Sequence, residues 1–231
     1  MWFAKLRTII LRIGRRSMII SLVTMKGGSG KSTTAMCLAG QWMTNRKRVA
    51  LLDSDPAATV LRWQQMGTDL ADIQTRGVIS TNLASVANSL LENEVERVII
   101  DTPGFRSPVL EAAITVADIL IVPVKPSPVD FQVAADTIEL IEEIQGMGSS
   151  TAIRILISQC NNSSVIARHM RSEMTDAGYN ILDGQISTRV AFAEAALSGS
   201  TPTFTHPGSE AAIEIAELCA EIDSIPLHKE F

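Results

Sequence analysis

Short apolar runs alternate with helix-like segments along most of this chain. Five runs are rich in Val, Ile and Leu and have the length of buried strands: residues 18–24, 48–53, 95–101, 118–124 and 153–158. Apolar residues recur at helical spacing in the segments 32–44, 59–65, 83–91, 128–144 and 164–177. Weaker strand candidates are residues 77–80 and a run with Ile181 and Leu182. This alternation predicts an α/β fold, a doubly wound and mostly parallel sheet with helices on both faces.

The segment 209–223 has one apolar and one acidic face. It predicts a surface helix that closes the domain, and its acidic stripe is expected to face water. The stripe consists of Glu210, Glu214, Glu217 and Glu221.

A glycine-rich segment directly after the first strand carries the strongest chemical signal. Its residues are Lys26, Gly27, Gly28, Ser29, Gly30, Lys31, Ser32 and Thr33. The glycines leave the backbone free to turn its N–H groups toward a phosphate, at the start of a helix whose N-terminus favours anions. Lys31 supplies a cation and Ser32 a hydroxyl for Mg²⁺. The sequence therefore predicts a phosphate-binding loop, although Met25 stands where the common pattern has glycine.

Acidic residues follow two of the other predicted strands. Asp53 ends the second run and Asp55 follows it two residues later, and Asp101 ends the third run. Ligands of doubly wound sheets bind beyond the carboxyl ends of the strands, so these acids are expected beside the phosphate loop. Asp101 in this position is typical of a Mg²⁺-holding acid, and the alternative is a turn or helix-capping acid. A capping role before Pro56 is likewise the alternative for Asp55.

Composition narrows the possible classes. With 46% hydrophobic and 19% charged residues the chain is typical of a globular protein, and three cysteines without metal spacing indicate core residues in a reducing cytoplasm. A net charge of −5 means that any DNA contact needs a local basic patch.

Residues 1–17 hold five basic residues and no acid. They are expected to be an N-terminal extension, disordered or not native, with a membrane-surface segment as the alternative. Residues 18–231 are expected to form one domain.

Three segments resemble a known family. The spelling KGGSGKST is similar to the deviant Walker A motif of the ParA/MinD group of P-loop ATPases, with Lys26 as its second lysine. "LLDSDPAAT" is similar to the DxDPQ segment of that group, with Ala57 in place of glutamine, and "ILIVPVKPSPVDF" to a segment of short ParA-type plasmid partition ATPases. The likeness runs from about residue 18 to residue 220.

The resemblance implies ATP and Mg²⁺ as cofactors and a role for each motif residue. Lys31 and the loop amides would hold the phosphates, and Thr33 would lie near the α-phosphate. Ser32, Asp101 and Asp53 would hold Mg²⁺, and Asp55 would orient the attacking water. Lys26 would reach the nucleotide of a second subunit, and the alternative is that it stays within its own subunit or is merely solvated. A weaker match places Asn161 at the adenine.

The resemblance also implies partners. The ATP-bound homodimer would bind DNA without sequence preference, and a ParB-type centromere-binding protein or cargo adaptor would stimulate hydrolysis, in the cytoplasm on the nucleoid. The candidate DNA contacts are Arg154, Arg168, Arg171 and Arg189. The alternatives are a MinD-like membrane-associated ATPase, a positioner of a non-plasmid cargo and a non-catalytic adaptor. A nitrogenase-type cluster carrier would need a paired-cysteine site, which the sequence lacks.

Overall fold

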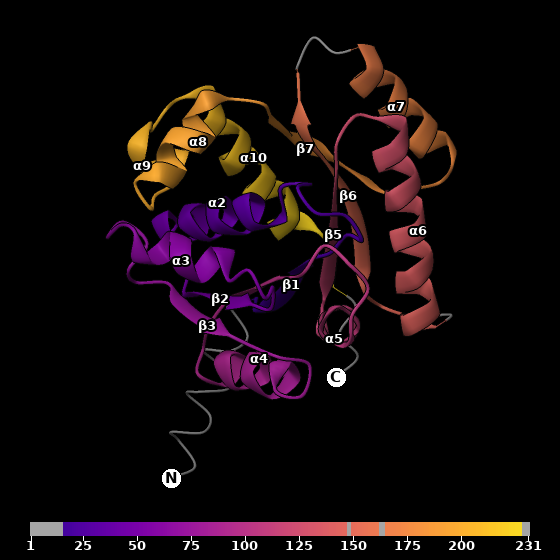
Figure 1. Ribbon diagram of the computed structural model, residues 1–231. Helices are drawn as coiled ribbons and strands as arrows, with labels where there is room; N and C mark the ends of the chain where they lie inside the picture. Colours follow the sequence, from indigo (N-terminus) through magenta and orange to yellow (C-terminus); the bar gives the residue numbers. More distant parts are fainter. Residues whose placement is uncertain (1–15, 147–148, 162–164, 228–231) are drawn as a thin grey trace.

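The computed structural model describes residues 16–146, 149–161 and 165–227 (Figure 1). Its centre is a seven-stranded sheet in the order β3-β2-β4-β1-β5-β6-β7, and every neighbouring pair is parallel. The predicted doubly wound α/β fold is confirmed. The strands are β1 (Met18–Leu22), β2 (Val49–Asp53), β3 (Gln74–Gly77), β4 (Arg97–Asp101), β5 (Ile119–Val124), β6 (Ala152–Cys160) and β7 (Ile181–Ser187).

Helices cover both faces of the sheet because successive strand side chains point to opposite sides. On one face, α2 (Lys31–Thr44), α3 (Thr59–Gln65), α8 (Val190–Leu197) and α10 (Glu210–Ser224) share an apolar cluster with β1, while the short α9 (Pro202–Thr205) packs on α2 and α10. The opposite face carries α4 (Leu83–Glu92), α5 (Pro108–Val116), α6 (Pro128–Gln145) and α7 (Val165–Asp176).

Two details of the sequence prediction were wrong. The weak strand expected at residues 77–80 lies earlier, at β3, where mostly exposed polar side chains form an edge strand. The pairing with β2 ends at Gly77, so the apolar Val78 and Ile79 follow the strand. The apolar pattern also missed α5, α8 and α9, although Ser107 caps α5 with Pro108 in its first turn, a recognised start signal.

The acidic stripe of α10 does not simply face water, which corrects that expectation. Glu221 accepts hydrogen bonds from the amides of Asp183 and Gly184, at 2.7 and 2.9 Å. Glu214 accepts from the amide and hydroxyl of Ser187. Because β7 is an edge strand with unpaired backbone donors, these carboxylates attach the helix to the sheet edge.

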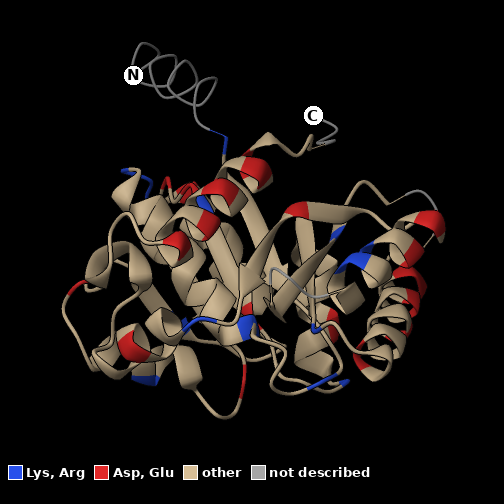
Figure 2. Cartoon of the chain, turned by 90° about the horizontal axis from the view of Figure 1, so that it is seen from above, with Lys and Arg blue, Asp and Glu red and all other residues tan. Residues whose placement is uncertain are grey.

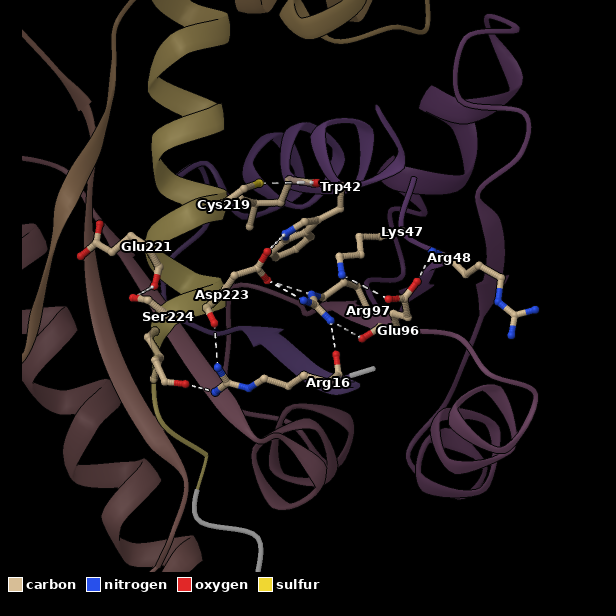
Figure 3. Close-up of polar contacts among 12 residues, drawn as sticks. Arg16, Trp42, Lys47, Arg48, Glu96, Arg97, Cys219, Glu221, Asp223 and Ser224 are labelled. Atoms are coloured by element: carbon tan, nitrogen blue, oxygen red, sulfur yellow. Dashed lines mark hydrogen bonds and ion pairs between the residues drawn. The ribbon is translucent and has the colours of Figure 1, made fainter. Parts of the chain in front are cut away.

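A polar network ties the chain together at the amino ends of the strands (Figure 3). The buried Arg97 donates to Asp223 of α10 at 3.0 and 2.7 Å, and the Trp42 indole donates to the same carboxylate at 3.2 Å. Arg97 also donates to the carbonyl of Arg16, and Arg16 donates to carbonyls at the end of α10. Arg16 and Ser17 thus adjoin the domain, while the rest of the expected extension lies outside the described residues.

Candidate nucleotide-binding site

The glycine-rich segment forms the turn between β1 and α2. Gly28 and Gly30 have φ angles of 74° and 96°, in the left-handed region that glycine adopts readily. Gly30 is the N-cap of α2 and has no side-chain cap, so the first amides of the helix are left for an anion. Lys31 is the first residue of α2 and its ammonium donates to the Lys26 carbonyl at 3.2 Å. The predicted phosphate loop therefore has the geometry that phosphate binding needs.

Burial lowers the pKa of Lys31, and the nearby charges of Asp101 and Asp55 oppose that shift. A lysine that is only 6% exposed, beside two acids, is held at a fixed place in the site. Such a cation stabilises phosphate charge more than a solvated one does, because water screens it less.

The end of β6 supports the loop from the side, a contribution that the sequence analysis missed. The buried Ser158 hydroxyl donates to the Ser29 carbonyl at 2.7 Å. The Gln159 side chain donates to the Gly28 carbonyl at 3.0 Å, and Gln159 itself has a φ of 51°. A left-handed residue that is not glycine is strained, and such strain concentrates at functional sites. Asn161 is exposed just after β6, but nothing in the structure tests its expected contact with adenine.

Ser32 and Asp101 meet across the loop as the sequence predicts. The Ser32 hydroxyl donates to Oδ2 of Asp101 at 2.6 Å. The other carboxylate oxygen, Oδ1, is buried and has no hydrogen-bond partner among the described residues. Burial raises the pKa of Asp101 to about 7, against the opposing hydrogen bond from Ser32. A buried, unpaired carboxylate oxygen beside a hydroxyl is a donor set that fits Mg²⁺.

In the described part of the chain, no three His, Cys, Asp or Glu side chains group closely enough to hold a metal ion. Mg²⁺ differs from zinc in this respect, because it is commonly held by one or two carboxylates together with substrate phosphates and water. Ser32 and Asp101 would therefore hold the cation when a nucleotide supplies the remaining oxygens.

The loop after β2 carries the other two acids. Asp53 is only 3% exposed, and its two oxygens accept the amides of Asp55 and Leu61, at 3.2 and 3.1 Å. It therefore fixes the loop to the start of α3, and its expected contact with Mg²⁺ stays a prediction. Asp55 is partly exposed and accepts the Ala57 amide at 2.8 Å through Oδ1. The Ser54 hydroxyl donates to the Asp101 carbonyl at 2.7 Å, which joins this loop to β4.

The segment after β4 touches the phosphate loop directly. A side-chain carbon at Gly104 would lie 2.6 Å from the amide nitrogen of Gly27 and 2.8 Å from the carbonyl carbon of Lys26. Real Cβ atoms do not approach backbone so closely, so only glycine fits. The sequence analysis did not assign Gly104 a role, although Gly104 lies in the segment that directly follows β4.

Lys26 is partly exposed and paired with an acid. Its ammonium lies 2.9 Å from Oδ1 of Asp130, in the first turn of α6 of the same subunit. The sequence analysis did not identify Asp130 as its partner. The site thus gathers Lys26, Lys31, Asp55 and Asp101 at the carboxyl edge of the sheet, as the order of the strands predicts.

The four candidate DNA-binding arginines do not behave alike. Arg189 forms a 2.7 Å ion pair with Glu214, and its expected contact with DNA stays a prediction. Arg171 donates to the carbonyls of Leu182 and Asp183. Arg154 is partly buried and Arg168 is exposed on α7. Figure 2 shows basic residues scattered among acidic ones.

Two relatives match most of the chain. It is 28% identical over 214 residues to "Maintenance of carboxysome distribution protein A" of Halothiobacillus neapolitanus, covering 90% of this chain and 97% of the relative. It is 25% identical over 181 residues to "Protein ParA" of Rhizobium radiobacter, covering 75% of this chain and 80% of the relative.

Solved structures share the fold. MinD cell division protein from Aquifex aeolicus superposes with a TM-score of 0.73 at 15% identity, covering 91% of this chain and 100% of that chain. The ATP complex of a Cyanothece McdA variant superposes with a TM-score of 0.71 at 15% identity, covering 94% of this chain and 100% of that chain. The predicted P-loop fold of the ParA/MinD type is therefore confirmed.

The model of the family described as VirC1 protein matches residues 17–201, which include the phosphate loop, both acidic segments and β6. The chain belongs to this family and, with its relatives, to the ParA-type positioning ATPases.

Proposed function

We propose that this protein hydrolyses ATP with Mg²⁺, dimerises when ATP is bound, and uses this cycle to position DNA or another cargo. The observation that carries the proposal is the Ser32–Asp101 pair beneath a phosphate loop that also holds a buried lysine. Phosphoryl transfer to water needs held phosphates, a metal, an oriented water and a cation for the developing charge. This chain has a residue for each requirement.

The position of each residue in the fold supports its proposed role. The loop amides and Lys31 bind the phosphates, and Ser32 with Asp101 would hold Mg²⁺, which supplies charge neutralisation when bound. Asp55 is partly exposed on a loop anchored by Asp53, so it is free to orient a water at the terminal phosphate. Gln159 and Ser158 keep the loop in its binding shape.

The second subunit enters through Lys26. We infer that the Lys26 side chain leaves its contacts within its own subunit and reaches the nucleotide bound by the partner subunit. There it would neutralise charge in the manner of an arginine finger, which is worth ~10³–10⁵ in rate. Exposed apolar side chains near the carboxyl edge, Phe105 and Val129, give such a dimer apolar area to bury.

The cargo is a further part of the proposal. A plasmid, with a ParB-type partner and non-specific DNA binding on the nucleoid, is the first candidate. A non-DNA cargo is the second, because the match to the carboxysome distribution protein covers nearly the whole of that relative. A MinD-like membrane-associated role is the third candidate. Among the described residues, no helix has the length and apolar character to cross a bilayer.

The decisive experiment combines sizing with a phosphate-release assay. We expect a monomer without nucleotide, a dimer with ATP and Mg²⁺, and slow hydrolysis that Lys26→Ala abolishes while ATP still binds. Mixing Lys26→Ala with Lys31→Ala protein tests action between subunits, because the second variant still offers Lys26 to the ATP of the first. Full activity of Lys26→Ala alone would contradict the proposal.

A salt titration then separates the cargo candidates. DNA contacts through phosphates weaken steeply with salt and require no particular sequence. We expect random-sequence duplex to bind only in the presence of ATP. A protein that dimerises with ATP but binds neither duplex DNA nor anionic vesicles would point to a partner-borne cargo instead.

A further inference from the structure

We propose that Asp130 is a positioning residue that keeps Lys26 on its own subunit until a second ATP-loaded copy is present. This inference rests on the proposed function, since it assumes that Lys26 acts across a dimer. It adds a residue that controls when the lysine becomes available, outside the phosphate loop and outside both acidic segments.

The ion pair itself is the first observation. The Lys26 ammonium lies 2.9 Å from Asp130, whose side chain is only 9% exposed while that of Lys26 is 37% exposed. The acid is thus fixed in the fold and the lysine is the movable partner. Asp130 is held by its position in the first turn of α6, where Ser127 caps the helix and also donates to the carboxylate.

A helix that controls Lys26 must also be tied to the loop backbone. The Met25 amide donates to the hydroxyl of Thr137 on α6 at 3.2 Å, one residue before Lys26. Thr137 is fully buried. The backbone anchor is therefore buried, whereas the Asp130 contact is a side-chain contact at the edge of the site, so the lysine can leave without movement of the helix.

A second lysine explains why Lys26 can leave without a large penalty. An acid that is nearly buried is costly to leave without a cation. Lys125 lies five residues before Asp130. Its ammonium is 4.0 Å from the position that a Cβ atom on Gly28 would take, so it lies beside the phosphate loop. Burial alone would raise the pKa of Asp130, but hydrogen bonds from Ser127 and Lys26 and the charges of Lys26 and Lys125 lower it overall. When Lys26 leaves, the charge of Lys125 still acts on the acid and reduces the cost of the separation.

The test compares Asp130→Asn with Asp136→Asn, the same substitution elsewhere on α6. Asp136 bonds to Gln132 within the helix and does not contact Lys26. Dimerisation is measured by ultracentrifugation across protein concentrations, with a non-hydrolysable ATP analogue and Mg²⁺. Two ion pairs break per dimer, so Asp130→Asn should lower the dimerisation midpoint on the order of tenfold. Asp136→Asn should leave it unchanged, and Asp130→Glu should restore the wild-type midpoint.

Chemical labelling gives a readout that a merely structural role would not move. In nucleotide-free protein, acetylation of Lys26 followed by mass spectrometry should be several-fold faster in Asp130→Asn than in wild type. If that variant does not fold, Lys125→Gln supplies the test: it removes the second cation that acts on Asp130, so Lys26 should be held more tightly and acetylated more slowly than in wild type. In a Lys26→Ala background, Asp130→Asn should no longer affect dimerisation.

The possible outcomes distinguish a failure of the proposed function from a failure of the inference about Asp130. A wild-type protein that stays monomeric with the ATP analogue contradicts the proposed function. A wild type that dimerises, with Asp130→Asn at the same or a higher midpoint, overturns this inference alone. An equally large fall in the dimerisation midpoint for Asp136→Asn would also overturn the inference. The effect would then come from the loss of a negative charge anywhere on α6.

Discussion

The hydroxyl of Ser32 donates to the carboxylate of Asp101 across 2.6 Å, from the first turn of α2 to the last residue of β4. The two residues are 69 positions apart, and only the parallel pairing of β1 with β4 brings them together. This pair leaves the second oxygen of Asp101 buried and unpaired in the described structure. The chemistry of the site can be tested residue by residue.

Lys31→Ala should abolish ATP binding. The loop otherwise offers neutral amides, and a hydrogen bond to a charged group is worth about 1.5–3 kcal/mol. The affinity should therefore fall by more than about tenfold. Calorimetric titration with ATP and Mg²⁺ measures the change, with circular dichroism to check the fold. An unchanged affinity would show that the loop does not hold the phosphates.

Asp55→Ala should retain ATP binding and the dimer but stop hydrolysis. The substitution removes the carboxylate that orients water, while the phosphate contacts of Lys31 stay in place. Sizing with ATP should show a persistent dimer, and a phosphate-release assay should show almost no product. Turnover at the wild-type rate would move the role to another acid, and Asp53 would be examined next.

Gly104→Ala should weaken ATP binding although no charge is lost. The added carbon would collide with the backbone of Lys26 and Gly27, at 2.6–2.8 Å, and would push the loop out of its binding shape. Gly146→Ala is a control that meets no atom within 4 Å, though its left-handed φ strains the variant. Comparable ATP affinities for wild type and Gly104→Ala would mean that the loop can shift without cost.

Asp101 should make the nucleotide-free protein less stable as the pH rises. Burial raises its pKa from 3.8 to about 7, so between these values the folded protein keeps a proton that the unfolded chain has released. Stability is then lost as the pH rises through about 7. Asp101→Asn cannot titrate, so the difference in melting temperature between variant and wild type should change from about pH 4 to about pH 7, in favour of the variant, and level off above about pH 7. Parallel pH curves for the two proteins would refute the assignment.

Asp223→Ala should destabilise the fold without weakening ATP binding. It leaves the buried Arg97 guanidinium without its carboxylate, and breaking such a pair costs roughly 3 kcal/mol, at the low end of the usual range because Asp223 is 30% exposed. Urea unfolding measures the loss, and nucleotide titration serves as the comparison. A loss of ATP affinity in Asp223→Ala would instead indicate coupling between the two ends of the sheet.

The sequence predicted the sheet and the core of the site well because both depend on local signals. Five apolar runs and one glycine-rich segment define five strands and the phosphate loop, and strand ends then place Asp55 and Asp101 beside it. Contacts between distant segments could not be predicted. The partner of Lys26 is Asp130, far along the chain on α6, and the partner of Arg189 is Glu214. Nothing in the spacing of those residues indicates the pairing.

The network of Arg16, Arg97 and Asp223 lies at the amino ends of the strands, at the opposite end of the sheet from the nucleotide site. Both the first described residue and the end of α10 therefore lie at the end of the sheet away from the phosphate loop. A fluorescent reporter joined directly to the described residues, before Arg16 or after Leu227, would start from that end. The movement of the protein in living cells can thus be imaged without placing a bulky fusion beside the phosphate loop.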